Sequence, residues 1–163
     1  MAVKRLFAEE RSRQEDWLGY GSYKQYLLSP EWKAIRAAVL TARPKCEVCG
    51  TYARQVHHHS YHWLVMNGSM SEMLVSICNG CHYEIEFEKG FKLPQKAVAE
   101  KLIRILGAVG KRSTKARLMK WQKIVDDLYL SNPRTRAKMK AAIEKSTGRK
   151  IPPRPRVKKK RFH

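Results

Sequence analysis

The sequence predicts an α+β protein, with a small core braced by a metal ion, flanking helices and a helical, strongly basic C-terminal region. Two observations predict the braced core and the helices: four cysteines stand in two Cys-x-x-Cys pairs, and apolar residues recur at helical spacing after residue 94. The strands are implied by a resemblance of other segments. A length of 163 residues suits one domain with an appendage. Hydrophobic residues make up 43% of the chain, which is too many for a wholly disordered protein.

Two helices are expected before the first cysteine. Residues 1–20 show a short amphipathic pattern, with apolar side chains set among charged ones. A second helix is expected to begin at Ser29 and Pro30, because serine caps helix N-termini and proline fits the first helical turn. Pro44 ends this helix before the cysteines. Its apolar face carries Trp32, Ile35, Ala38 and Val39.

The four cysteines are expected to form one zinc site. Cys46 and Cys49 form the first pair, and Cys78 and Cys81 form the second, with 28 residues between the pairs. The first residues lack the apolar core of a signal peptide, so we expect a cytoplasmic protein (nuclear in a eukaryote), in which disulfides are rare. The alternative is a redox pair or two unrelated motifs. Two such turns can supply four thiolates at about 2.3 Å from one Zn²⁺, and because this leaves no open position, such a zinc is structural.

Five of the six histidines fall within residues 57–82, and a cluster of this density suggests a metal site. In a strand, His57 and His58 point to opposite faces, so they need not share one task. On a helix that begins at the second cysteine pair, His82 and Glu86 stand four residues apart and can hold one cation between them. Of the other two histidines in this cluster, His59 is expected to face away from the metal and His62 is expected to lie in the loop.

Four sequence segments follow one another in a characteristic order. They are YLLSPEWKAIR over residues 26–36, the first cysteine pair with its glycine, Val56-His57-His58, and LVSICNGCH over residues 74–82. Together they resemble the HNH nuclease family, and most of all its small phage and bacterial members, whose ββα-metal (His-Me finger) core is braced by a four-cysteine zinc. The resemblance covers residues 26–88. It implies the strands of the α+β fold, and a metal-dependent endonuclease of a homing or phage-encoded kind that hydrolyses DNA phosphodiester bonds.

The same resemblance implies roles for four side chains. His57 matches a metal ligand at the end of the first strand, and His82 matches a second ligand at the start of the helix. His58 matches the general base that takes a proton from the attacking water. Glu86 stands where most members have a last histidine ligand. A carboxylate there suits a hard cation such as Mg²⁺, with Mn²⁺ and Zn²⁺ as alternatives.

One position departs from the family pattern. The middle residue of the motif is usually Asn or Asp, and here it is Met73, which cannot form the side-chain hydrogen bond that ties down the loop beside the base. If the register shifts in the loop, Asn67 or Ser71 is the alternative. Together with Glu86, Met73 keeps a rival interpretation open: a non-catalytic, zinc-stabilised protein, derived from the HNH fold, that binds DNA or RNA.

The chain is strongly basic, with 34 Lys and Arg against 14 Asp and Glu and a formal charge of +20. Such an excess indicates a polyanionic partner, with DNA as the first candidate and RNA as the alternative. No stretch approaches 18 consecutive apolar residues, so no membrane span is expected. Residues 111–163 hold 19 basic and 3 acidic side chains, a net charge of +16. The charge for binding is therefore concentrated in the C-terminal third.

The region after residue 94 is expected to be helical. Apolar residues recur at spacings of three and four over residues 95–106 and 114–130. A third helix is expected from Pro133 to the stop signal at Gly148. The proline-rich basic end of the chain, from Ile151 onwards, is expected to be a flexible tail.

These patterns divide the chain into four segments. They are an N-terminal helical extension (1–25), a nuclease core with its zinc site (26–90), a helical basic region that binds nucleic acid (91–148) and a flexible basic tail (149–163). Phosphate contacts give affinity and positioning without base specificity. The side chains expected to make them are Lys33, Arg36, Lys115, Arg117, Lys120, Lys123, Arg134, Arg136, Lys138, Lys140, Arg154, Arg156, Lys158, Lys159, Lys160 and Arg161.

Overall fold

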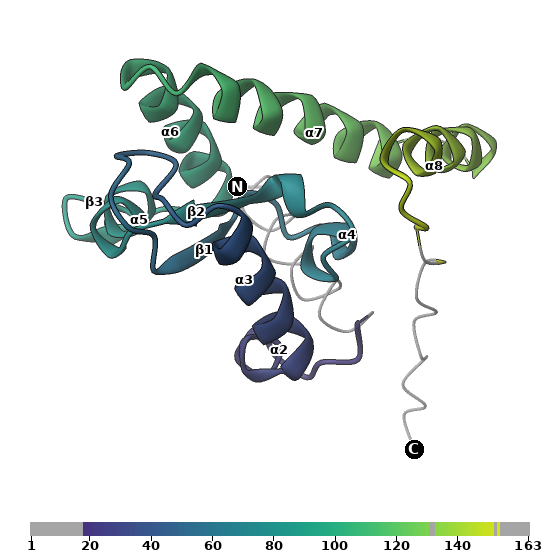
Figure 1. The fold of residues 1–163 in the computed structure, drawn as a ribbon, viewed down its shortest axis with the longest axis horizontal. Helices are drawn as coiled ribbons and strands as arrows, with labels where there is room; N and C mark the ends of the chain where they lie inside the picture. The colour runs from purple at the N-terminus through teal and green to yellow at the C-terminus, as the bar shows by residue number, and fades with distance from the viewer. Residues whose placement is uncertain (1–17, 131–132, 152, 154–163) are drawn as a thin grey trace.

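The structure is a computed structural model that describes residues 18–130, 133–151 and 153 (Figure 1). Within them the protein is α+β, with seven α-helices and two small antiparallel sheets. The α+β class and the long C-terminal helices are as predicted. Most of the helix expected over residues 1–20 lies outside the described residues. So do the expected phosphate contacts of the tail: Arg154, Arg156, Lys158, Lys159, Lys160 and Arg161.

Two helices precede the cysteines among the described residues; the second begins where Ser29 and Pro30 predict it, and the first was not predicted from the sequence. Helix α2 (Tyr23–Leu28) and helix α3 (Pro30–Ala42) are separated by Ser29, whose hydroxyl accepts a hydrogen bond of 3.1 Å from the backbone N–H of Trp32. Proline in the first turn of α3 costs nothing, since that N–H has no partner within a helix. Helix α3 packs on the larger sheet with Trp32 and Val39 buried and Ile35 partly buried, as predicted. Ala38, which was predicted on the same face, is exposed.

The larger sheet joins two segments that flank the histidine-rich loop. Strand β1 (Gln55–His58) pairs antiparallel with β2 (Leu74–Ile77), so that His57 lies opposite Val75 and His58 opposite Leu74. Between them the chain forms helix α4 (Trp63–Met66) and the 3-10 turn η1 (Ser71–Met73), both with buried side chains. Strand β2 leads directly into helix α5 (Asn79–Glu86). The order is therefore strand, strand, helix.

A tight hairpin follows α5. Strand β3 (Phe87–Glu88) pairs antiparallel with β4 (Phe91–Lys92). Its two-residue turn is Lys89-Gly90, with φ of 49° and 80°, the left-handed conformation that the favoured hairpin turns require. The glycine at the second position supplies that conformation without steric cost.

The C-terminal helices complete the core of the preceding segment. They are α6 (Gln95–Ala108), α7 (Arg112–Leu130) and α8 (Pro133–Thr147), and α7 is the long green helix in Figure 1. Leu102, Leu106 and Leu118 are fully buried in one cluster with Cys46 and Ile77. Trp121, Val125 and Leu128 of α7 join a second cluster, with Trp32 and the α4 side chains. Each cluster thus contains residues from both sides of the boundary predicted at residue 90. Among the described residues, no helix is long and apolar enough to cross a membrane.

Candidate metal centres

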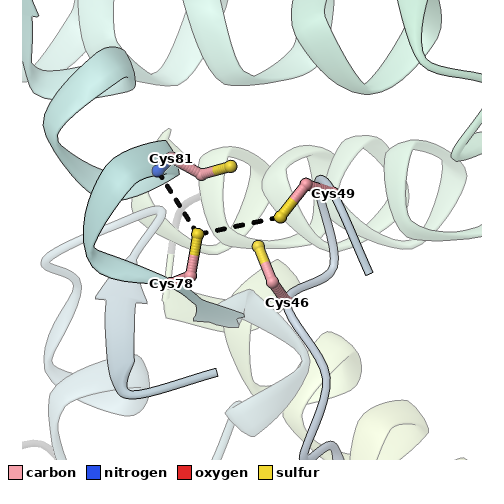
Figure 2. Close-up of side chains that lie close together, drawn as sticks. All are labelled: Cys46, Cys49, Cys78 and Cys81. Atoms are coloured by element: carbon pink, nitrogen blue, oxygen red, sulfur yellow. Dashed lines mark hydrogen bonds between the residues drawn. The ribbon is translucent and has the colours of Figure 1, made fainter. Parts of the chain in front are cut away.

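The four cysteines converge from two segments of the chain (Figure 2). Cys46 and Cys49 lie on a turn closed by the bridge between Lys45 and Tyr52. The second pair lies at the start of α5, where the Cys78 sulfur accepts a hydrogen bond of 3.4 Å from the backbone N–H of Cys81 and so caps the helix. The four sulfur atoms all lie within 4.8 Å of one another.

This spacing fits a tetrahedral thiolate site. Four sulfurs at about 2.3 Å from one ion lie about 3.8 Å apart, and the sulfurs of Cys49 and Cys78 are separated by 3.7 Å. A hydrogen bond with the Thr51 hydroxyl lowers the pKa of the Cys49 thiol to about 6. The hydrogen bond from the backbone N–H of Cys81 also lowers the pKa of Cys78. Both effects favour the thiolate form of these two cysteines, which is the form that binds metal, whereas burial raises the pKa of Cys81. The spacing of the four sulfurs therefore carries the inference that the cluster can hold a structural ion.

A second cluster lies between β1 and α5. The ligand atoms of His57, His82 and Glu86 lie within 4.8 Å of one another. His82 and Glu86 are neighbours on one face of α5, with 3.3 Å between Nε2 and the nearer carboxylate oxygen. The other oxygen of Glu86 lies 3.5 Å from Nζ of Lys92 on β4. Strand β1 brings His57 against this pair, with 5.5 Å between the ring centroids of His57 and His82.

His57 distinguishes this cluster from an ordinary helical ion pair. Its side chain is buried, and its Nε2 has no hydrogen-bond partner among the described residues. An unpaired buried polar atom costs about 1–3 kcal/mol, so such atoms are rare without a ligand, a water or an ion. Burial lowers the pKa of His57 well below its usual value, and the hydrogen bond from His82 lowers the pKa of Glu86. A neutral imidazole beside a carboxylate is a suitable donor set for a divalent cation.

His58 points to the opposite face of β1, where aromatic side chains enclose it. Its ring is stacked between Trp32, at 4.4 Å between centroids, and Tyr61, at 5.4 Å. Its Nε2 lies 2.9 Å from the hydroxyl of Tyr26, and its Nδ1 lies 3.3 Å from the hydroxyl of Tyr23. Burial lowers the pKa of His58 to about 3. The structure therefore brings together His57 and its two expected partners on α5, but it does not bring His58 to that cluster.

The loop residues considered for the middle position of the motif have other contacts. Met73 is fully buried in the core. The side-chain oxygen of Asn67 accepts a hydrogen bond of 2.9 Å from the backbone of Ser69, and the backbone oxygen of Ser71 accepts one from Arg43. Among the described residues, His59 and His62 belong to neither of the two candidate metal clusters. His59 is buried, and His62 caps α4 through its Nδ1.

Several basic side chains expected to contact phosphates have partners within the protein. Arg117 donates from Nε to the backbone oxygen of Glu72 at 3.0 Å, and its Nη1 lies 2.8 Å from the carboxylate of Glu47. Others that pair with backbone oxygens or carboxylates are Arg36, Lys123 and Lys140. Exposed on the surface are Lys33, Lys120, Arg134 and Lys138, whereas Lys115 and Arg136 are half-buried.

Sequence reasoning missed Glu47. This residue stands between the first two cysteines, and its carboxylate also accepts a hydrogen bond of 2.9 Å from the backbone of Ser76 on β2. It further contacts Arg43, the residue directly after α3, at 3.7 Å and the hydroxyl of Thr114 on α7 at 3.4 Å. The only signal in the sequence was an acidic residue inside a cysteine pair, in a chain where basic residues dominate. Glu47 thus links the cysteine turn to β2 and to both neighbouring helices.

No family model, curated protein or solved structure matches this chain. The resemblance to the HNH family therefore rests on the sequence segments quoted above.

Proposed function

We propose that the protein is a metal-dependent HNH endonuclease that hydrolyses DNA phosphodiester bonds. The observation that carries the proposal is the cluster of His57 on β1 with His82 and Glu86 on α5, in which the buried Nε2 of His57 has no hydrogen-bond partner among the described residues. This arrangement supports the ββα-metal core that the sequence resemblance implies. A purely structural ion pair between His82 and Glu86 has no need of a third, buried donor.

In this proposal the two clusters have different tasks. The four cysteines hold a structural Zn²⁺ that braces the turn before β1 against the start of α5. The second cluster holds a divalent cation, Mg²⁺ with Mn²⁺ and Zn²⁺ as alternatives, which supplies charge stabilisation at the scissile phosphate and the leaving oxygen. Lys92 lies beside Glu86 and orients its carboxylate. Exposed basic side chains, including Lys33 and Lys120, contribute contacts to the phosphate backbone of DNA.

His58 is the general base of this proposal. A base within hydrogen-bond reach of the attacking water typically contributes about 10²- to 10⁴-fold to the rate. Both ring nitrogens of His58 contact tyrosine hydroxyls, so base catalysis requires the ring to exchange one of these hydroxyls for water.

The enclosure of His58 favours a second candidate function. If His58 keeps both tyrosine hydroxyls as partners, the protein is a zinc-stabilised DNA- or RNA-binding module without catalysis. The fully buried Met73, in the position where the family has a polar residue, supports this alternative in the same way.

A nuclease assay with matched variants separates the two functions. Plasmid DNA and a labelled RNA are incubated with zinc-loaded protein in Mg²⁺, Mn²⁺ or additional Zn²⁺, and in EDTA. Glu86→Gln and His82→Ala are expected to lower the cutting rate about a hundredfold or more. Glu84→Gln is the control, because Glu84 is exposed on the same helix outside the cluster, and it should leave the rate unchanged.

The outcomes point in opposite directions. Cutting that persists in EDTA or in Glu86→Gln contradicts a metal-dependent nuclease at this cluster. Salt-sensitive binding without cutting, by protein that retains its zinc and its fold, supports the binding module instead. Loss of cutting in His58→Gln, with folding intact by circular dichroism, supports His58 as the base.

A further inference from the structure

The hydroxyl of Tyr26 joins three separate elements of the fold. It belongs to α2, contacts the His58 ring of β1 at 2.9 Å and donates to the backbone oxygen of Met66 at the end of α4 at 3.0 Å. Tyr26 is 1% exposed, so bulk solvent does not reach its hydroxyl. Burial raises the pKa of Tyr26 far above its usual value, so the phenol keeps its single proton.

That single proton determines the direction of both hydrogen bonds. A carbonyl oxygen can only accept, so the contact with Met66 uses the hydroxyl proton of Tyr26. The contact of 2.9 Å with His58 then requires the ring nitrogen to be the donor, and Nε2 therefore carries the imidazole proton. Nδ1 is left without a proton and accepts from the hydroxyl of Tyr23 at 3.3 Å.

The opposite tautomer leaves a buried group unpaired. If the proton were on Nδ1, Tyr26 would have to donate to Nε2 and would abandon Met66. The carbonyl of Met66 lies at the C-terminal end of a helix, where backbone oxygens lack partners within the helix. An unpaired buried carbonyl disfavours that tautomer by roughly tenfold or more.

We propose that Tyr26 is a positioning residue that fixes the tautomer and the orientation of His58 and ties the loop between β1 and β2 to that histidine. The effect on catalysis rests on the proposed nuclease function, in which His58 is the base. The assignment of the His58 tautomer is independent of that function. Met73 cannot make a side-chain hydrogen bond that holds this loop. The hydrogen bond from the Tyr26 hydroxyl to the backbone oxygen of Met66 holds the loop from outside it. Stacking against Trp32 and Tyr61 keeps the His58 ring in the required plane.

The test combines Tyr26→Phe with two matched variants in the full-length, zinc-loaded protein. Tyr26→Phe removes only the hydroxyl. Tyr20→Phe is the control, because the Tyr20 ring lies 5.5 Å from that of Tyr26 but its hydroxyl donates to Glu31. Tyr23→Phe removes the hydroxyl that faces Nδ1. All three keep the aromatic ring, and circular dichroism and thermal unfolding establish that each is folded.

The first readout is the tautomer of His58, from two-bond ¹⁵N–¹H correlations of the imidazole. The proton is expected on Nε2 in the wild-type protein, in Tyr20→Phe and in Tyr23→Phe. Tyr26→Phe is expected to lower the ratio of the two tautomers about tenfold. A proton on Nδ1 in the wild-type protein, or an unchanged ratio in folded Tyr26→Phe, overturns the inference.

The second readout is the kinetics of DNA cutting. Tyr26→Phe is expected to lower kcat about tenfold with KM unchanged, whereas Tyr20→Phe changes neither constant. An unchanged kcat in Tyr26→Phe overturns the positioning role. If no variant and no wild-type protein cuts DNA, while the tautomer shifts as expected, the nuclease function fails and the tautomer assignment stands.

Discussion

Replacing Arg117 with methionine is expected to lower the free energy of unfolding by about 2–3 kcal/mol. Arg117 makes two charge-assisted contacts, with the Glu72 carbonyl at 3.0 Å and the Glu47 carboxylate at 2.8 Å. The side chains of Arg117 and Glu47 are only 23% and 10% exposed, so solvent screens their attraction weakly. Methionine keeps the apolar stem of the side chain and removes both contacts.

The magnitude follows from what each group loses and keeps. Hydrogen bonds to charged groups contribute about 1.5–3 kcal/mol each. Part of this loss is offset, because Nη2 of Arg117 is a buried donor without a partner among the described residues, and the substitution removes it. Glu47 retains its hydrogen bond from the Ser76 backbone and its contact with Arg43, so it is not left unpaired. The net cost is therefore below the sum of the two bonds.

The assay is urea and thermal unfolding of zinc-loaded protein, with Lys120→Met as the control. Lys120 lies three residues further along α7 and is exposed, so its replacement should change stability by no more than about 0.5 kcal/mol. For a chain of this size, a loss of 2–3 kcal/mol lowers Tm by about 5–10 °C. Equal stability of the two variants would refute the structural role of Arg117. A loss of about 0.9 from the salt slope of DNA binding in folded Arg117→Met would instead favour the phosphate contact that the sequence predicted.

Three further predictions concern the cysteine site, the core and the tail. Cys49→Ser, or chelation of the wild-type protein, is expected to release about one equivalent of zinc and to unfold the chain, as seen by metal analysis and circular dichroism; a native spectrum without zinc would contradict this. Leu118→Ala is expected to cost about 3 kcal/mol in urea unfolding because Leu118 is fully buried, whereas exposed Met119→Ala should cost less than about 0.5 kcal/mol, and similar costs would argue against the shared core. Deletion of residues 154–163 is expected to reduce the salt slope of DNA binding by up to about five with Tm unchanged, and an unchanged slope would exclude phosphate contacts from the tail.

Local patterns in the sequence predicted α3, α5 and the three C-terminal helices, and they predicted which residues form the two clusters that could hold metal, but they did not predict α2 and α4. Ser29 and Pro30 placed the start of α3 correctly, because capping depends on neighbouring residues. The spacing of His82 and Glu86 on a helix is also local, and the structure confirms that these side chains are neighbours. The convergence of the two cysteine pairs was predictable because four thiols in a small core have few other roles.

The surroundings of His58 were not predictable in the same way. Tyr23 and Tyr26 precede it by 35 and 32 residues, and nothing in their local pattern indicates that α2 will cover that face of β1. The partners of Arg117 are also distant in the sequence, and a basic residue on an amphipathic helix has the pattern of a solvated side chain. Both environments depend on packing between residues that are distant in the sequence. Hydrophobic periodicity and capping residues describe only local structure, so they do not predict such packing.

The attachment of α7 to the core has a consequence for where a nuclease of this design cuts. Helix α7 has 19 residues and therefore spans about 28 Å, which is about eight base-pair steps along a duplex. Because Leu118 and Arg117 fasten the helix to the cysteine turn, the exposed basic residues of α7 cannot swing relative to His57 and Glu86. If the proposed nuclease function holds and α7 contacts DNA phosphates, the cut is expected at a fixed distance from those phosphates, whatever the DNA sequence.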